Sequence, residues 1–409
     1  MYIDPLMADL EAENLEGLLV VAASAEDPDM APFAGGAHVR SSLLVANRRR
    51  REVKLGFFTP MEREEAAATG LPLLTPEELD IPRWDKTLSD PGEHLAAVLG
   101  QALLRAQMTP GKVALAGHFA SGVVLEACRR LEADGFAFFS GHRLLERYRK
   151  TKSERQVEEI RRAAEGTGVA FRRVAALLAA AGEGENGELI LQGEPLTVGR
   201  LRREIGRVLA DRGLQQPDGN IVAPAEESAV PHNAGTDTRV LRRGESLIVD
   251  LYPKGLLYAD CTRTFCVGEP PPELARAHGA VLEALQEAHR TVAPGQRGWE
   301  LQQRTCEILG GHGYATPISE PGTVTGYVHN LGHGTGFELH ELPSFRETAG
   351  EREGRLASGD VLTLEPGLYE PEGGWGVRLE DLVGLGPDGP ENLTPWPYAL
   401  DPRAWLEEV

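Results

Sequence analysis

Four carboxylates in the second half of the chain lie at the ends of apolar, strand-like runs. Asp250 and Asp260 lie on the two arms of one predicted hairpin, whereas Glu365 and Glu380 each end an apolar run in a second one. A charge at the end of a buried strand is costly unless it has a partner. This repeated pattern restricts the second half of the chain to folds that give these charges a partner, and a cation is one such partner.

The first hairpin shows why a cation fits. If Asp250 and Asp260 face each other, the turn centres on Gly255. Opposite residues on paired strands share a face, with Cβ atoms about 5 Å apart. Two carboxylates that close repel and raise each other's pKa, and a bound cation removes the repulsion. The alternative is that the aspartates are exposed hairpin residues and that the two glutamates lie at a sheet rim.

Histidines fill the segment between the two hairpins. The stretch HNLGHGTGFELH contains His329, His333 and His340, and glycines flank the middle one. Glycine permits close backbone approach and unusual φ values, so His333 is the strongest candidate ligand. The alternative for all three is a loop histidine without a role. His232, in the loop VPHNAGTD, is by itself more often of that kind.

Together these residues predict a metal site. Carboxylates and an imidazole suit a pair of hard or borderline divalent ions, with Mn²⁺ expected first and Co²⁺, Zn²⁺ and Fe²⁺ as alternatives. Two such ions about 3.5–4 Å apart share a water, lower its pKa and clamp a scissile carbonyl. The candidate donors are Asp250, Asp260, His333, Glu365 and Glu380.

The 409 residues suggest two or three domains, and the change of pattern near residue 148 favours two. Residues 1–147 alternate strand-like and helix-like runs, which predicts a smaller α/β N-terminal domain. A long amphipathic segment follows, and Ser153 with Gln156 fits a capping box at its start. Helices and long strand pairs then predict an α+β second domain over residues 148–409.

Charge and cysteine usage exclude some functions. Lys and Arg total 42 against 62 Asp and Glu, and a net charge of −20 argues against nucleic-acid or anionic-membrane partners. No apolar run approaches the ~18 residues of a membrane helix, and the N-terminus lacks a signal pattern. Four cysteines without a CxxC pair predict reduced thiols in the cytoplasm. The run Arg48–Arg51 predicts a solvated hairpin turn, with a docking patch as the alternative.

Several segments resemble a known enzyme family. The stretches HNLGHGTGFELHELP, DVLTLEPGLY, GVRLEDLV and VDLYPKGLLYADCTRTF are similar to the signature segments of the M24 metallopeptidases. The branch that they resemble contains the Xaa-Pro dipeptidases (prolidases) and the Xaa-Pro aminopeptidases. The resemblance implies a C-terminal creatinase/aminopeptidase "pita-bread" domain. It is strong over about 150–395, and over residues 1–147 it rests mainly on the two-domain layout.

The resemblance implies a role for each candidate ligand. Asp260 and Glu380 would bridge two ions, Asp250 would complete one site, and His333 and Glu365 would complete the other. Glu365 would also take the proton of the bridging water.

The resemblance also assigns the remaining polar residues. His340 and His232 would hold the substrate and stabilise the tetrahedral intermediate. His329 would lie in the pocket wall and help to bind substrate or move a proton. Arg378 would brace the second hairpin through an ion pair.

The chain departs from the family pattern at the first hairpin. Asp250 and Asp260 are ten residues apart, one fewer than is usual in the family. A one-residue slip turns a side chain to the opposite face, so either the turn is shortened together with a lost bulge, or Asp250 is displaced. The intact TRTF after Asp260 favours the shortened turn. Tyr252 stands where relatives often have a small residue, and it would narrow the pocket.

The expected function is therefore a cytoplasmic, homodimeric, dinuclear metallopeptidase. It would hydrolyse the N-terminal Xaa-Pro bond of dipeptides or short peptides through a metal-bridging hydroxide. Dipeptidase and longer-peptide aminopeptidase activity both stay open. Two alternatives are a metallohydrolase or lyase of the same fold, acting on proline-free peptides or a non-peptide substrate, and a catalytically silent binding module.

Overall fold

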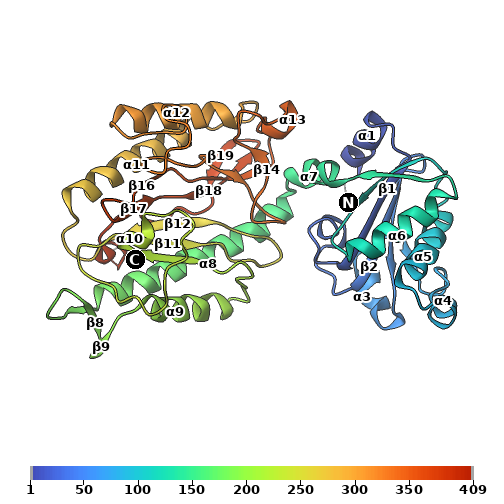
Figure 1. Ribbon diagram of the computed structural model, residues 1–409, viewed down its shortest axis with the longest axis horizontal. Helices are drawn as coiled ribbons and strands as arrows, with labels where there is room; N and C mark the ends of the chain where they lie inside the picture. Colours follow the sequence, from blue (N-terminus) through green and yellow to red (C-terminus); the bar gives the residue numbers. More distant parts are fainter. Residues whose placement is uncertain (1–2, 407–409) are drawn as a thin grey trace. The chain divides into compact units, whose positions relative to one another are not determined.

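The computed structural model describes residues 3–406 and divides the chain into two compact units, 1–149 and 150–409 (Figure 1). The division falls two residues after the boundary expected from the sequence. Each unit has its own buried core, and each is described separately below.

A mixed six-stranded sheet forms the centre of the N-terminal unit, in the order β4-β3-β2-β1-β5-β6. In β1, Leu18 and Val20 face one side and Leu19 and Val21 the other, and all four are buried. Alternating apolar residues that are buried on both faces require helices on both faces. The strands are β1 (Gly17–Ser24), β2 (Arg40–Asn47), β3 (Glu52–Phe57), β4 (Leu73–Leu74), β5 (Lys112–Ala116) and β6 (Ala137–Ser140).

Helices cover both faces of this sheet. α5 and α6 pack on one face, and α1 and α7 pack on the other. Asp90 caps α5 by accepting a hydrogen bond from the backbone N–H of Glu93. The helices are α1 (Asp4–Ala12), α2 (Ala31–Ala34), α3 (Arg63–Ala68), α4 (Ile81–Thr87), α5 (Pro91–Arg105), α6 (Ser121–Glu132) and α7 (His142–Lys150), with the short 3₁₀ turn η1 (Pro60–Glu62).

The alternating pattern of strands and helices expected here is confirmed, and Arg48–Arg51 form the turn between β2 and β3. Arg49 and Arg51 in that turn pair with Glu16 and Asp4. The Pro-containing segment 71–90 is not a bare loop, because it contains β4 and α4. A proline in the first turn of α4 supplies a fixed φ where no backbone donor is needed, so it starts this helix.

The C-terminal unit opens with α8, whose predicted capping box is present. Ser153 accepts a hydrogen bond from the backbone of Gln156, whose side chain accepts one from the backbone of Ser153. Strands lie between two helical layers, α8 with α9 and α11 with α12 (Figure 1). The helices are α8 (Glu154–Ala179), α9 (Val198–Ala210), α10 (Ala225–Ser228), α11 (Pro272–Thr291), α12 (Gly298–Gly311) and α13 (Glu351–Gly354), with the 3₁₀ turn η2 (Pro402–Leu406).

Short sheets form the middle layer of this unit. Their orders are β10-β11-β12, β14-β13-β15-β18-β19, β16-β17 and a peripheral β7-β8-β9. The strands are β7 (Gly182–Glu183), β8 (Leu189–Leu191), β9 (Glu194–Pro195), β10 (Ile221–Pro224), β11 (Leu247–Leu251), β12 (Cys261–Phe265), β13 (His333–Gly334), β14 (Glu341–Ser344), β15 (Val361–Leu364), β16 (Gly367–Glu370), β17 (Trp375–Arg378), β18 (Asp381–Gly386) and β19 (Gly389–Asn392).

The second predicted hairpin is split between two sheets. β15 pairs with β18, and β16 pairs with β17. Glu365 lies in the break between β15 and β16, and Glu380 lies in the break between β17 and β18. Pro366 has no N–H to donate, which suits the point at which the chain leaves one ladder for another.

The register of the first hairpin differs from the expected one. Asp250 pairs with Thr262, and Leu251 pairs with Cys261, so Asp250 and Asp260 do not face each other directly. Side chains alternate with a period of two, so Asp260 shares the face of Thr262 and is a diagonal neighbour of Asp250. The ladder between β11 and β12 is regular over its five pairs, which agrees with a shortened turn.

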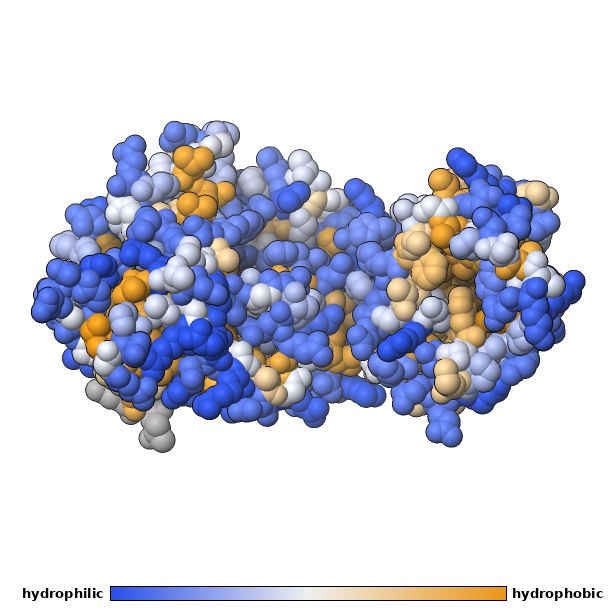
Figure 2. Space-filling view, turned by 60° about the horizontal axis from the view of Figure 1, so that its bottom comes forward, coloured by the Kyte–Doolittle hydropathy of each residue, from blue (hydrophilic) through white to orange (hydrophobic). Residues whose placement is uncertain are grey.

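The surface of both units is largely hydrophilic, with apolar residues gathered on part of the N-terminal unit (Figure 2). Within residues 3–406, no helix is long and apolar enough to cross a membrane. All four cysteines are buried and unpaired.

Candidate metal centre

Carboxylates and one imidazole gather where the sheets of the C-terminal unit meet. Asp260 directly precedes β12, His333 opens β13, and Glu380 lies between β17 and β18. Their ligand atoms all lie within 4.8 Å of one another. Both carboxylates are buried, and the donors come from segments more than 40 residues apart in sequence.

His333 is oriented towards these carboxylates. Its Nε2 lies 3.7 Å from Asp260 Oδ2 and 3.4 Å from Glu365 Oε1. Its Nδ1 lies 3.0 Å from the carbonyl oxygen of Gly334, which fixes the ring with the proton on Nδ1. The lone pair of Nε2 then faces carboxylate oxygens, an arrangement that calls for a cation between them.

The glycines around His333 are required by the backbone. A Cβ on Gly332 would lie 2.0 Å from the carbonyl oxygen of Thr363, and one on Gly334 would lie 1.9 Å from that of Leu342. The short strand β13 fits between β14 and β15 because these two positions have no side chain. The sequence pattern of glycines around a histidine therefore has a packing cause.

Asp250 lies at the edge of the same cluster. Its Oδ2 accepts a 2.6 Å hydrogen bond from Arg378 Nη2, which is the ion pair expected for Arg378. Its Oδ1 and the Oδ1 of Asp260 are buried without a hydrogen-bond partner. Buried carboxylate oxygens rarely lack a partner, so these two atoms fit a cation site.

Two residues that the sequence analysis did not single out orient the carboxylates. Thr262 Oγ1 donates to Glu380 Oε2 over 2.6 Å, and Arg378 Nε donates to Thr262 Oγ1 over 3.2 Å. The second is Tyr369, whose hydroxyl accepts from Arg378 Nη1 over 2.9 Å. Thr262 has one usable sequence signal, because it lies two residues after Asp260 and therefore on the same strand face.

Burial and mutual repulsion perturb the carboxylates. Burial, reinforced by Asp250 and opposed by Arg378, raises the pKa of Glu365 to about 8. Burial and then the neighbouring carboxylates raise the pKa values of Asp260 and Glu380 well above their ordinary range. Divalent ions would neutralise these crowded, buried carboxylates and so remove their mutual repulsion.

His329 is held in the wall of the site. Its Nε2 lies 2.9 Å from the hydroxyl of Tyr369, and its Nδ1 lies 2.8 Å from the carbonyl oxygen of Asn330. Burial lowers the pKa of His329 to about 4, so the ring is neutral near pH 7. The contacts form a continuous chain from Asp250 through Arg378 and Tyr369 to His329.

The other two histidines, His232 and His340, are exposed to solvent. His340 is exposed, and its ring centroid is 4.2 Å from that of His333, with the rings at 78°. Burial and then the charge of His232 lower the pKa of His340, and His232 also contributes to the lowered pKa of His329. The carbonyl oxygen of Pro231, next to His232, accepts a 3.2 Å hydrogen bond from Arg378, so all four predicted histidines lie near one site.

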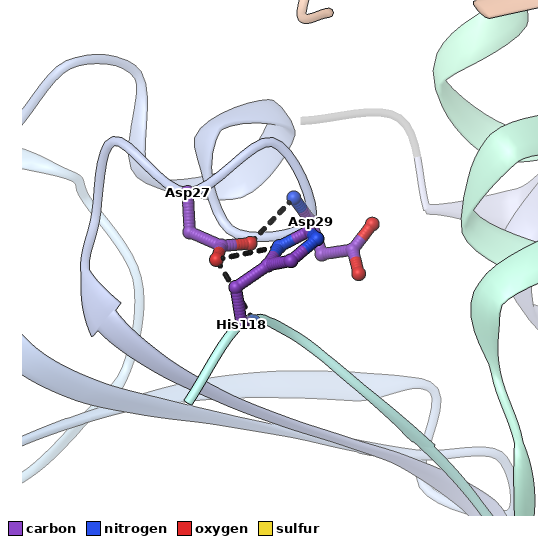
Figure 3. A group of neighbouring side chains, drawn as sticks. All are labelled: Asp27, Asp29 and His118. Carbon is purple, nitrogen blue, oxygen red and sulfur yellow. Dashed lines mark hydrogen bonds and ion pairs between the residues drawn. The ribbon is translucent and has the colours of Figure 1, made fainter. Parts of the chain in front are cut away.

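A second acidic cluster lies in the N-terminal unit (Figure 3). Asp27 accepts hydrogen bonds from the backbone N–H groups of Asp29 and His118. Asp29 accepts from the backbone of Gly117 and from the guanidinium of Arg149. Every carboxylate oxygen here already accepts a hydrogen bond, so this cluster braces two loops and lacks the orphaned oxygens of the first one.

Known proteins resemble this chain in sequence. A 213-residue stretch is 34% identical to the Xaa-Pro dipeptidase of Pyrococcus furiosus and covers 49% of this chain and 56% of that relative. A 260-residue stretch is 29% identical to the probable dipeptidase PepE of Mycobacterium tuberculosis and covers 63% of this chain and 62% of that relative. The first match thus spans little more than half of the relative's length.

Solved structures resemble the chain over nearly its whole length. The prolidase from Pyrococcus horikoshii has a TM-score of 0.74 at 22% identity, covering 97% of this chain and 99% of that one. The X-Pro aminopeptidase from Thermotoga maritima has a TM-score of 0.70 at 23% identity, covering 98% and 99%. At such identities the likeness shows the fold alone, and it confirms the expected α+β, two-domain, prolidase-like fold.

The sequence resemblance is confirmed at the level of the family. The sequence model of metallopeptidase family M24 matches residues 158–386, which include all five proposed ligands and all four histidines singled out above. Because this match spans more than half of the 409 residues, the chain belongs to metallopeptidase family M24.

Proposed function

We propose that this protein is a dinuclear metallopeptidase that hydrolyses the Xaa-Pro bond at the N-terminus of dipeptides or short peptides. Membership of the M24 family implies divalent metal ions. The observation that supports a site for them here is the pair of buried, unpartnered oxygens, Asp250 Oδ1 and Asp260 Oδ1, beside the free Nε2 of His333. Four carboxylates and one imidazole are donors that suit Mn²⁺ first, and Co²⁺, Zn²⁺ or Fe²⁺ next.

We assign the shared positions to the two most enclosed carboxylates. Asp260 and Glu380 would contact both ions, Asp250 would complete one site, and His333 and Glu365 would complete the other. Thr262 and Arg378 would hold Glu380 and Asp250 in place, because each already donates to one oxygen of its partner. When bound, the two ions would lower the pKa of a shared water and polarise the scissile carbonyl.

Side chains around the centre would transfer the proton and bind the substrate. Glu365, whose Oε1 lies 3.4 Å from Nε2 of His333, would take the proton of the shared water. His340 and His232 are exposed, and they would donate hydrogen bonds to a bound peptide. Both ring nitrogens of His329 are already hydrogen-bonded, which favours a place in the pocket wall over proton transfer.

The preference for Xaa-Pro substrates, the location in the cytoplasm and the homodimer are also proposals. The Pyrococcus furiosus relative is an Xaa-Pro dipeptidase, which supports Xaa-Pro substrates. Four buried, unpaired cysteines fit a reducing compartment such as the cytoplasm. The homodimer expected from the family resemblance stays a prediction.

Release of amino acids from a peptide panel tests the proposal. Metal-free protein would be incubated with Xaa-Pro dipeptides, Xaa-Pro-Xaa tripeptides and proline-free dipeptides, with Mn²⁺ or with a chelator. We expect chelator-sensitive cleavage of Xaa-Pro peptides, strong loss of kcat in Glu365→Gln, and no loss in the exposed control Glu347→Gln.

The pattern of cleavage separates the alternatives. Preference for dipeptides indicates a prolidase, and preference for tripeptides indicates an aminopeptidase. Cleavage of proline-free peptides alone would remove the substrate assignment and keep the metal site. Metal binding without any cleavage would contradict the proposal and favour non-peptide chemistry or a binding module.

A further inference from the structure

A buried glutamine of α12 contacts the segment that leads into the metal centre. Gln302 is 1% exposed, and α12 also buries Leu301, Cys306 and Leu309. A buried amide is costly unless its polar atoms have hydrogen-bond partners, whereas an apolar side chain at this position would avoid that cost. The partners of this amide therefore indicate what it does.

The amide of Gln302 makes four hydrogen bonds. Its oxygen accepts from the backbone N–H of Leu331 over 2.5 Å and from the hydroxyl of Tyr327 over 2.9 Å. Its nitrogen donates to the carbonyl oxygen of His329 over 3.3 Å and to Cys306 Sγ over 3.6 Å. Because a backbone N–H can only donate, the amide oxygen must face Leu331, and this contact fixes the orientation of the amide.

Three of these partners belong to one short segment. Residues 327–331 lie in the irregular stretch between α12 and β13 and end two residues before His333. Leu331 is fully buried, so its backbone N–H needs a partner, and Gln302 supplies it. Gln302 thus contacts the backbone on both sides of Asn330 and joins this stretch to α12.

The same stretch is bonded to a proposed metal ligand. The carbonyl oxygen of Leu331 accepts a 2.7 Å hydrogen bond from the backbone N–H of Glu365. Leu331 therefore contacts Gln302 through its N–H and Glu365 through its carbonyl. Two residues later, the backbone N–H of His333 donates to Thr363 Oγ1 over 3.1 Å. A shift of Leu331 would move the backbone to which Glu365 is bonded.

Gln302 also holds His329 in two ways. It donates directly to the carbonyl oxygen of His329. It also accepts from the hydroxyl of Tyr327, whose ring lies edge-on to that of His329, with centroids 5.3 Å apart and ring planes at 70°. Gln302 therefore sets the backbone position of His329 and the position of one neighbour of its ring.

We propose that Gln302 is a positioning residue, which acts through Leu331 and His329 to hold Glu365 and the pocket wall in the geometry that cleavage requires. The inference rests on the proposed Xaa-Pro peptidase function and adds a residue to its machinery. The four contacts of Gln302 are to backbone groups, Tyr327 and Cys306, so its replacement leaves all five proposed metal ligands in the chain.

Gln302→Met tests this role, because it keeps the approximate size of the side chain and removes the amide. Values of kcat and KM would be measured for an Xaa-Pro dipeptide well below the Tm of each variant, with kcat expressed per chain that carries two Mn²⁺ ions. We expect kcat to fall about tenfold or more and KM to change less than about threefold, because proton transfer to Glu365 belongs to the transition state. The matched control is Gln303→Met, the exposed neighbour on α12, which should keep the wild-type kcat.

Two further variants separate the contact with Leu331 from the packing of α12. Gln302→Asn is one methylene shorter, which withdraws the amide from Leu331, so it should lose kcat as Gln302→Met does. Gln302→Glu has the shape of the wild-type side chain and keeps an oxygen that accepts from Leu331 and Tyr327, so it should retain most of the wild-type kcat. This pair decides the question if Gln302→Met does not fold.

The outcomes distinguish this inference from the proposed function. A wild-type kcat per metal-loaded chain in Gln302→Met or Gln302→Asn, with or without a lower Tm, would show a structural role alone and would overturn the inference while the Xaa-Pro activity stands. Equal losses of kcat in Gln302→Asn and Gln302→Glu would also overturn it. Absence of cleavage of every Xaa-Pro peptide by the wild type would overturn the proposed function and this inference together.

Discussion

At the scale of single residues, the metal centre depends on neutral and cationic donors that hold its carboxylates. Thr262 and Arg378 are both buried, and each donates to a proposed ligand. Such supporting partners fix the orientation of a ligand before the metal binds, so their loss weakens binding without removing a donor atom.

Thr262→Val removes the hydroxyl that holds Glu380 and keeps the shape of the side chain. We expect the affinity for Mn²⁺ to fall about 10- to 100-fold, because Glu380 loses its orienting hydrogen bond. Competition with a fluorescent chelator measures this affinity. The matched control is Thr291→Val, at the end of α11, where the hydroxyl bonds only to backbone carbonyls of its own helix. Equal affinities in the two variants would contradict the role of Thr262.

The raised pKa of Glu365 predicts a pH dependence for the metal-free protein. Its folded pKa of about 8 exceeds the ordinary value for a glutamate, so the folded state binds more protons than the unfolded state between about pH 5 and pH 8. The free energy of unfolding of the metal-free protein therefore falls as the pH rises through that range. Asp260 and Glu380 act with the same sign.

Thermal unfolding of chelator-treated protein at pH 5, 6, 7 and 8 measures this dependence. We expect Tm to fall with rising pH, and Glu365→Gln to reduce the slope because it removes one of the three groups. Excess Mn²⁺ should reverse the trend, since metal binding requires the deprotonated carboxylates. A Tm that rises from pH 5 to pH 8 without metal would contradict the account.

Single residues also show how far the sequence can be interpreted. The five proposed ligands are visible because each interrupts an apolar or glycine-rich pattern. Thr262 is harder to assign, because its partner Glu380 lies 118 residues away.

At the scale of elements, the site depends on a strand of two residues. β13 lies between β14 and β15, and the absence of a side chain at Gly334 and at the preceding Gly332 lets the three backbones approach closely. The position of His333 is therefore set by how tightly these strands pack.

Gly334→Ala tests this packing. The added Cβ would lie 1.9 Å from the carbonyl oxygen of Leu342, so β13 must shift, and overpacking of this kind costs about 1–3 kcal/mol or more. We expect a lower Tm and weaker Mn²⁺ binding. Gly279→Ala in α11 is the control, because nothing lies within 4 Å of its Cβ, and alanine favours a helix by up to about 1 kcal/mol. Normal metal affinity in Gly334→Ala would contradict the role of the glycine.

Elements differ in how well the sequence predicts them. α8 and α9 could be placed because Ser153 and Thr197 cap them and their apolar spacing is helical. The split of the second hairpin into two sheets could not be predicted. Long-range packing decides which strands pair with β15 and β16, and the local sequence pattern does not record it. The observed partner of Asp250 is Thr262, two residues away from the expected Asp260, for the same reason. The alternation of side chains fixes which face of the sheet a residue lies on, but it leaves the pairing register open.

At the scale of the whole molecule, the proposed chemistry belongs to one of two units. Every proposed ligand lies in residues 150–409, and the N-terminal unit has its own sheet and buried core. The change of sequence pattern near residue 148 was sufficient to predict a division, because a capped amphipathic helix begins there.

Calorimetry of the full chain tests this separation. We expect two thermal transitions, of which only one moves when Mn²⁺ is added to the metal-free protein. At about 1,000 times the dissociation constant, binding adds about 4 kcal/mol, which raises the Tm of a unit of this size on the order of 10 °C. A shift of both transitions by the same amount would contradict the assignment of the metal to the C-terminal unit alone.

The central claim is that the cluster around Asp260 and Glu380 holds two ions and cleaves Xaa-Pro peptides with them. Its most direct test is a titration of the metal-free protein with Mn²⁺ while the release of proline from an Xaa-Pro dipeptide is followed. The account predicts activity that is absent without metal and rises to a plateau at two equivalents per chain. Proline release that is independent of added metal and resistant to chelators would contradict it.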